Sequence, residues 1–338
     1  MIRWYGLKKE SGDQIKKEYK KKNKIKVIFL LLSIIVTVIL ISVYPTIGTV
    51  DVSVSDIYTV ILNKISPEED ELVNDIVLER VNRCIVGLLI GAGLAISGTT
   101  MQGILRNKFA SPFTLGIFSM AAVGMVIGSS LNLGTPFIVF LSSLLAFLPF
   151  LFYYYLSRYR EIGPETMVLI GIALVFTLLP LSLLSGFGSI KAVSWTDVLI
   201  MSIFLIACFF ILIFNAWNIN MISLGDTTAK TLGIEVDRVK FISLLISALI
   251  VAIVVSFASM IPFIGLVAPF LCRPIVGNDN RFLIPTTAFV GSSLVLMLDG
   301  LGRTIMAPMI LPAGILSMFL GGPVLLYLAI KKEKQGWL

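Results

Sequence analysis

Charged residues are absent from eight long stretches of this chain, and the longest stretch runs from Phe109 to Ser157. Nearly all Asp, Glu, Lys and Arg residues lie in the short segments between these stretches. A helix needs roughly 20 apolar residues to cross a bilayer, and only helices or closed barrels satisfy their backbone hydrogen bonds in lipid. Barrel strands would alternate apolar and polar residues, whereas these stretches are apolar throughout. The pattern predicts an all-α polytopic membrane protein.

Proline, glycine and polar breaks divide the apolar stretches into about ten predicted transmembrane helices. The turn at Asn132–Pro136 splits the longest stretch, and Ile261–Pro262 splits another. The boundaries between 260 and 282 stay open, because both helices there are short. We expect helices at 27–44, 82–105, 113–131, 136–156, 166–187, 197–216, 240–260, 263–276, 282–298 and 306–329.

Basic residues orient these helices, because short cytoplasmic segments of membrane proteins are enriched in Lys and Arg. An N-terminus in the cytoplasm places both termini inside and leaves few of the 27 basic residues outside. The chain then divides into a basic cytoplasmic arm (1–26), a transmembrane domain (27–330) and a cytoplasmic tail (331–338). The basic residues expected outside are Lys64, Arg80, Arg83, Lys191 and Arg303.

The N-terminal arm is rich in lysine between Lys16 and Lys26. Such a run resembles a nucleic-acid patch, but directly before a first span it is typical of a topology anchor that touches anionic lipid headgroups. No small-residue cleavage site follows the first apolar stretch, so we expect an uncleaved first helix. Membrane lipid is the expected partner of this arm, and no nucleic acid is expected.

The composition argues against an enzyme. The chain has no histidine, which removes the commonest general base and metal ligand. Cys84, Cys208 and Cys272 have no closely spaced partner, so we expect three small buried hydrophobes rather than a metal or disulfide site. We predict no catalytic residues. No G-x-x-x-x-G-K-[ST] motif is present, so any ATP hydrolysis belongs to another chain.

The charge-free stretches also bear on the source of energy. Ion-coupled transporters usually place ionisable groups in the bilayer, because those groups carry the coupled ion. The charge-free stretches supply none. We therefore expect a passive membrane component that moves with a partner. The alternative is a secondary transporter of a small solute that is not driven by ATP.

A long motif begins at Glu79–Arg83 and continues through the predicted second helix, where Gly87, Gly91 and Gly98 provide small surfaces for neighbouring helices. A polar break at Asn107–Gly116 follows, with a helix expected from 113. Together these residues resemble the FecCD family, the permeases of bacterial ABC importers for iron–siderophore complexes, haem and vitamin B12.

Three further blocks follow in the order of that family and extend the resemblance to residue 329. The second block lies between Leu224 and Gly233. The third block runs from Phe263 to Pro269 with Arg273, Gly277 and Arg281, and the fourth runs from Asp299 and Arg303 through Leu311–Gly314 to Gly321–Pro323.

The chain departs from the family pattern in three places. Asn82 replaces a usual proline, and Phe270 replaces a usual histidine, so no role is carried to Phe270. The segment between Leu169 and Trp195 looks shortened, which leaves the shape of the outer mouth and the substrate class open.

The resemblance implies a type II, B12-permease-like fold in the bacterial cytoplasmic membrane. It implies a multi-pass permease subunit for import, and not an enzyme. The expected partners are a second permease in a homodimer or heterodimer, two ATP-binding subunits that hold ATP and Mg, and an extracytoplasmic substrate-binding lipoprotein. This chain itself is expected to hold no cofactor. Iron(III)–siderophore complexes are the first expected substrates, with haem and cobalamin next.

The resemblance also assigns site residues. Arg80, Arg83 and Arg303 would dock the binding protein, whereas the residues alone leave plain interfacial snorkelling as an equal alternative. A short helix near Asp226, with Gly233 as its C-cap, would couple to the ATPase, and its alternative is an ordinary capped surface helix. The coupling residues are Leu224, Gly225, Asp226, Ala229, Lys230, Leu232 and Gly233; the inner gate residues, by position only, are Pro164, Glu165 and Thr166.

Overall fold

The computed structural model describes residues 2–48, 52–53, 57, 60, 71–160, 163–184, 190, 193–258, 261–307 and 309–331. All regular structure in these ranges is helical, which confirms the all-α class. The elements are α1 (Ile2–Val43), η1 (Tyr44–Thr46), α3 (Glu71–Leu105), α4 (Ile117–Ser130), α5 (Thr135–Arg160), α6 (Pro164–Leu183), α7 (Trp195–Phe214), α8 (Ala216–Ser223), α9 (Asp226–Thr231), α10 (Val236–Ala258), α11 (Ile264–Val276), α12 (Asn280–Thr304) and α13 (Ala313–Lys331).

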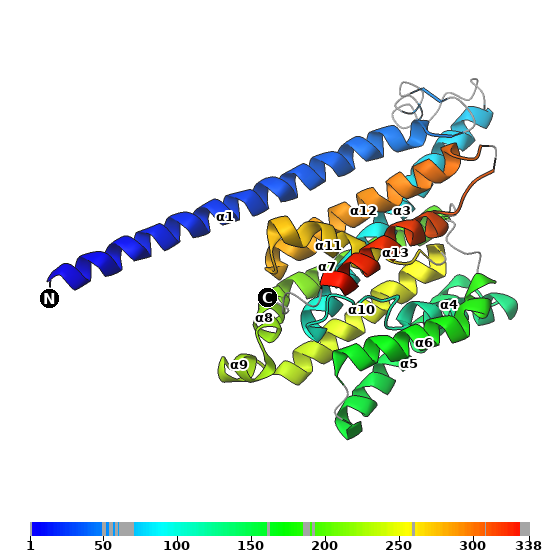
Figure 1. Ribbon diagram of the computed structural model, residues 1–338. Helices are drawn as coiled ribbons and strands as arrows, with labels where there is room; N and C mark the ends of the chain where they lie inside the picture. Colours follow the sequence, from blue (N-terminus) through cyan, green and yellow to red (C-terminus); the bar gives the residue numbers. More distant parts are fainter. Residues whose placement is uncertain are drawn as a thin grey trace.

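Seven of the described helices are long and apolar enough to cross a membrane, and three shorter apolar helices accompany them. The shorter ones lie in α4, α6 and α11, and each predicted transmembrane helix corresponds to one helix of the two groups. Figure 1 shows the start of α1, the end of α13 and the small helix α9 on the same side of the bundle. The cytoplasmic position of both termini stays a prediction.

Several predicted boundaries are wrong, because a helix does not stop where its apolar stretch stops. α1 begins at Ile2, so the basic arm is the first half of one continuous helix that projects from the bundle (Figure 1). α3 begins at Glu71 and therefore carries Arg80 and Arg83 well inside the helix instead of at its start. Outside the hydrocarbon core, charged residues are compatible with helix, and the periodic apolar signal alone cannot mark these ends.

Proline and glycine chemistry shortens two other predicted helices. α4 starts at Ile117 and not at 113, because Pro112 is followed by a turn that ends on Gly116 with a φ of 72°. α13 starts at Ala313, directly after Pro312. α12 instead runs on to Thr304, beyond the predicted end at 298, and so contains both Asp299 and Arg303.

α3 is the central helix, and glycine allows its closest contacts. A Cβ atom on Gly91 would overlap the backbone of Gly291 in α12. A Cβ atom on Gly98 would overlap the backbone of Gly265 in α11. In lipid the hydrophobic effect does not drive helices together. Small residues instead let the backbones approach closely, so that van der Waals packing stabilises the contact.

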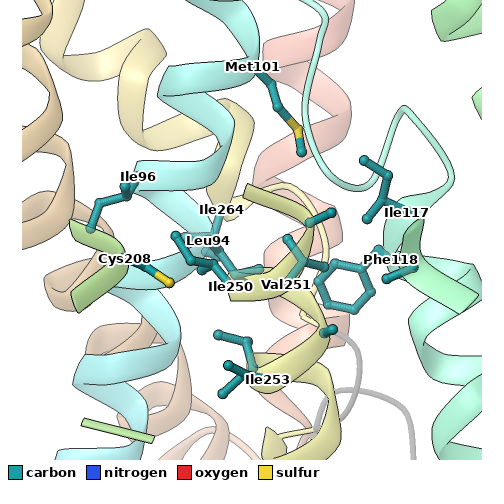
Figure 2. Close-up of a cluster of buried hydrophobic side chains, with 14 of the residues drawn as sticks. Leu94, Ile96, Met101, Ile117, Phe118, Cys208, Ile250, Val251, Ile253 and Ile264 are labelled. Atoms are coloured by element: carbon teal, nitrogen blue, oxygen red, sulfur yellow. The ribbon is translucent and has the colours of Figure 1, made fainter. Parts of the chain in front are cut away.

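The apolar core lies between α3, α4, α7, α10 and α11, as Figure 2 shows. Leu94 of α3 is surrounded by Ile250 of α10 and Ile264 of α11. Met101 is fully buried in the same core, as expected of a packing methionine. Cys208 lies at the edge of this core, and the described cysteines are all buried and unbridged, as predicted.

Two short helices start close to each other inside the bundle. The breaks that precede α4 and α11 meet where the rings of Phe113 and Phe263 lie 4.7 Å apart. Phe263 has a φ of 65°, a left-handed conformation that is costly for a non-glycine residue. Its ring fills the notch left by Gly321 in α13, where a Cβ atom would overlap it. This contact joins α11 to α13.

Candidate functional site at two ends of the bundle

An acidic residue inside α12 organises the end of the bundle at which α1 stops. Arg83 of α3 donates two hydrogen bonds to the Asp299 carboxylate, from Nη2 at 2.7 Å and from Nε at 3.1 Å. Arg303 donates to the same carboxylate from Nε at 3.0 Å, one helical turn further along α12. The side chain of Asp299 is 1% exposed. Asp299 is therefore a buried acid shared by two arginines.

The segment directly after α1 covers this cluster; we call Tyr44–Gly48 the strap. The Tyr44 hydroxyl donates to Asp299 and accepts a hydrogen bond from Arg303, whose guanidinium also lies 4.6 Å from the centre of the Tyr44 ring. Arg80 donates to the carbonyl oxygen of Pro45 at 3.0 Å. Arg303 donates to the carbonyl oxygen of Ile47 at 3.3 Å. The strap thus bonds directly to Arg80 and Arg303, and the side chain of Tyr44 also interacts with Arg83.

The three arginines of the predicted docking site lie at the same end of the bundle, but Arg80 and Arg303 are only 8% and 7% exposed. The structure corrects one premise of the sequence analysis. The apolar spans are not free of ionisable groups, because α12 carries Asp299 in its buried part. Binding-protein docking by Arg80, Arg83 and Arg303 stays a prediction.

The opposite end carries the predicted coupling helix. α9 begins at Asp226, as expected, after Gly225 with a φ of 131°. Gly233 follows with a φ of 80°, and two hydrogen bonds, Gly233 N–H to Lys230 and Ile234 N–H to Ala229, complete a Schellman motif. The sequence-based C-cap is therefore confirmed.

Asp226 fastens α9 to two long helices. Its carboxylate lies 2.6 Å from Lys240 Nζ of α10 and 3.6 Å from Arg106 Nη2, directly after α3. Ala229 faces inward and is fully buried. The flanking Leu224 and Leu232 are 55% and 60% exposed. The segment therefore presents apolar side chains outward from a firmly held helix.

A second acid, which the sequence analysis did not select, lies at the start of α12. Asp279 lies 2.9 Å from Arg281 Nη2 and 3.6 Å from Lys26 Nζ of α1. Asn220 of α8 donates to it at 2.8 Å. Burial by itself raises the pKa of Asp279, but hydrogen bonds from Arg281 and Asn220 and the positive charges of Arg281 and Lys26 lower it to about 2. Asp279 thereby joins α1, α8 and α12.

The predicted inner gate residues, Pro164, Glu165 and Thr166, form the first turn of α6. The side chains of Glu165 and Thr166 are exposed.

Phe270, which replaces the histidine of the family pattern, packs edge-on against Tyr327 of α13, with ring centres 5.6 Å apart. Within the described ranges, no group of three or more His, Cys, Asp or Glu side chains gathers closely enough to hold a metal ion. Lys64, Lys191, the segment 185–189 and the tail from 332 lie outside the described residues.

The long apolar helices and the close glycine contacts between them define a polytopic helical membrane protein. The family model of the FecCD transport family matches residues 30–331. An ABC transporter permease protein of Methanocaldococcus jannaschii is 32% identical over 95% of this chain and 99% of its own length. The haem-iron transport system permease protein IsdF of Staphylococcus aureus is 28% identical over 93% of this chain and 98% of its own length.

Solved structures share the fold. A metal-chelate type ABC transporter in an inward-facing conformation superposes with a TM-score of 0.75 at 24% identity, over 89% of this chain and 98% of that one. PsaBC from Streptococcus pneumoniae superposes with a TM-score of 0.57 at 15% identity, over 82% of this chain and 100% of that one. The chain belongs to the FecCD transport family, and it is an ABC transporter permease of the plasma membrane.

Proposed function

We propose that the chain is the permease subunit of a binding-protein-dependent importer for metal chelates, with iron(III)–siderophore complexes first and haem and cobalamin next. Two copies, or this chain and a related permease, form the translocation path at their interface. Two separate ATPase subunits supply the energy, and an extracytoplasmic binding protein delivers the substrate. The family membership supports this class of function, and the names of the relatives support a chelate or haem as cargo.

The observation that carries the proposal is the coupling segment. α9 is rigidly capped, and Asp226 ties it to α10 and to the end of α3. Leu224 and Leu232 point outward, as an apolar contact for a partner would require. A movement of the ATPase against these leucines would therefore be passed to α10 and α3, which are two of the helices that build the core. A transporter needs such a contact, because a partner shifts a conformational equilibrium only by binding its two states differently.

The experiment replaces Leu224 and Leu232 together by serine. Both side chains are exposed, so folding and membrane insertion should be retained, while ATP-driven uptake should fall at least tenfold if each lost contact weakens coupling by about 1 kcal/mol. Leu133→Ser is the matched control, because Leu133 is an exposed leucine in the turn between α4 and α5. Normal uptake and normal stimulation of the ATPase in the double variant would remove the coupling assignment.

The rival function is a secondary transporter, and Asp299 now has to be weighed in its favour. A buried carboxylate is a typical coupling group, but both oxygens of this one are already bonded, to Arg83 and Arg303. ATP-driven uptake should therefore persist in vesicles whose proton and sodium gradients have been collapsed. Uptake that an ionophore abolishes at constant ATP would favour the rival.

Cargo identity is tested separately with the soluble domain of the cognate binding protein. We expect it to bind an iron(III)–siderophore complex, and titration with haem and cobalamin distinguishes the next candidates. Binding of a small amino acid or sugar instead, with none of the three chelates bound, would contradict the proposed cargo while leaving the permease assignment intact.

A further inference from the structure

We propose that the strap, Tyr44–Gly48, is a built-in competitor for Arg80 and Arg303 in the cluster around Asp299, and that a carboxylate-bearing binding protein docks by displacing it. The proposal rests on the proposed function, because it needs a docking partner. It assigns different roles to the three arginines: Arg83 stays with Asp299, while Arg80 and Arg303 exchange one oxygen ligand for another.

The strap offers only neutral oxygens to the arginines that it contacts. Arg83 and Arg303 share the carboxylate of Asp299, whereas the strap atoms that bond to Arg80 and Arg303 are the carbonyl oxygens of Pro45 and Ile47 and the hydroxyl of Tyr44. A guanidinium can form two parallel hydrogen bonds to a carboxylate and neutralises its charge, whereas a carbonyl oxygen is neutral and accepts at a single atom. A carboxylate that replaces Pro45 O or Ile47 O therefore gains interaction energy at the arginine.

The position of the strap makes it the element that must move. The backbone of Gly48 lies against the guanidinium of Arg80, and a Cβ atom at Gly48 would overlap it. Arg80 and Arg303 are nearly inaccessible in this arrangement. A partner carboxylate can reach Arg80 only after the strap lifts, whereas the two-pronged bond from Arg83 to Asp299 needs no change.

The exchange would also release the end of α1. Tyr44 packs with Cys84 of α3 and Leu296 of α12 in a small buried cluster. Its hydroxyl is the only strap side-chain group, among those described, that bonds to Asp299 or Arg303. Lifting the strap therefore exposes Cys84, which is otherwise 2% accessible. The native thiol is a reporter of strap opening that does not depend on docking.

The test uses the substitution Tyr44→Phe, which removes one hydroxyl and keeps the ring. It is made in the assembled permease–ATPase complex. The matched control is Thr46→Val, which removes a strap hydroxyl that donates to Val43 O, at the end of α1, and not to the arginine cluster. We expect Tyr44→Phe to bind the soluble cognate binding protein about fivefold or more tightly than wild type, because a hydrogen bond to charged groups holds the strap. Thr46→Val should bind like wild type.

Cys84 labelling by a membrane-impermeant maleimide, in a background where Cys208 and Cys272 are replaced by alanine, gives the independent readout. Labelling should be faster in Tyr44→Phe than in Thr46→Val without any partner. Unchanged labelling, or faster labelling with unchanged or weaker docking, overturns the proposal. Wild-type protein that shows no docking at all contradicts the proposed function instead. If Tyr44→Phe does not fold, Gly48→Ala displaces the strap from Arg80 and is read by the same two measurements.

Discussion

The two ends of α12 carry the same arrangement of charges in different surroundings. At each end one aspartate is shared by two basic residues, of which one lies four or fewer residues away on α12 itself. Asp299 is 1% exposed and is bonded to Arg83 and Arg303, whereas Asp279 is 15% exposed and is bonded to Lys26 and Arg281. The difference lies in what else surrounds the carboxylate: protein at one end, and partly water at the other.

Both clusters fasten α1 to α12. Lys26 binds to Asp279 at the start of α12, and Tyr44, directly after α1, binds to Asp299 near the end of α12. Between them Thr37 of α1 lies 3.0 Å from the hydroxyl of Ser293 in α12. Although most of the apolar part of α1 is exposed in the single chain, the helix is therefore fastened to α12 at three points along its length. Burial largely determines how strongly an ion pair affects stability. We therefore expect the buried Asp299 pairs to be insensitive to salt, and the partly exposed Asp279 pairs to respond to pH and salt.

The largest expected effect is that of Asp299→Asn. Removing one partner of a buried ion pair leaves uncompensated charge, which costs about 3–5 kcal/mol in the free energy of unfolding. Here two arginines lose their acid at once. Thermal unfolding in detergent should show a much larger loss for Asp299→Asn than for Asp279→Asn. Equal losses for the two variants would show that burial does not distinguish the ends of α12.

The cluster of arginines around Asp299 was only partly predictable from the sequence. The motif placed Arg80, Arg83 and Arg303 at one end, and the spacing of Asp299 and Arg303 is that of an ion pair on one helical face. The four-residue spacing is the signal in the sequence that could have identified Asp299 as a site residue. The predicted helix 282–298 ends one residue before Asp299 and therefore does not contain it. The contact of Tyr44 with Asp299 joins residues that are 255 positions apart, and no local pattern specifies such a contact.

The coupling segment was predicted more completely. Its structure depends on local chemistry: a carboxylate at the first turn, and glycine where the backbone must turn left-handed. These rules act within a few residues, so a single sequence contains them. The partners of Asp226, Lys240 and Arg106, depend instead on how α3 and α10 pack, and they became visible only in the folded chain.

The second expected effect is that the stability contributed by the Asp279 cluster depends on pH. The pKa of Asp279 is lowered to about 2 in the folded protein, against about 3.9 for an unperturbed aspartate. A lowered folded-state pKa gives stability that is present above the unfolded value and lost as the pH falls through the folded value. The loss should amount to about 2 kcal/mol between roughly pH 4 and pH 2.

Asp279→Asn is the control for this titration, because asparagine keeps the shape and carries no proton equilibrium. Denaturant unfolding of wild type and variant should differ most near neutral pH, and the difference should shrink toward about pH 2 as the wild-type carboxylate is protonated. A difference that stays constant over this range would mean that the charge of Asp279 does not stabilise the fold.

The smallest expected effect concerns Lys26 and closes the comparison. Lys26 Nζ lies 3.6 Å from Asp279 and 5.3 Å from the centre of the Phe282 ring, at a partly exposed position. Such a pair contributes about 0.2–1 kcal/mol and is screened by salt. Lys26→Met should therefore lower the melting temperature slightly at low salt and not at about 1 M salt, where the Debye length is near 3 Å. Lys24→Met, which removes an exposed lysine from the same helix, should have no effect at either salt concentration.

The loss of stability in Asp299→Asn should persist in high salt, because no ions reach a carboxylate that is buried by protein. If the loss of stability in Asp299→Asn depended on salt, water would enter the cluster around Asp299, and the two ends of α12 would be alike.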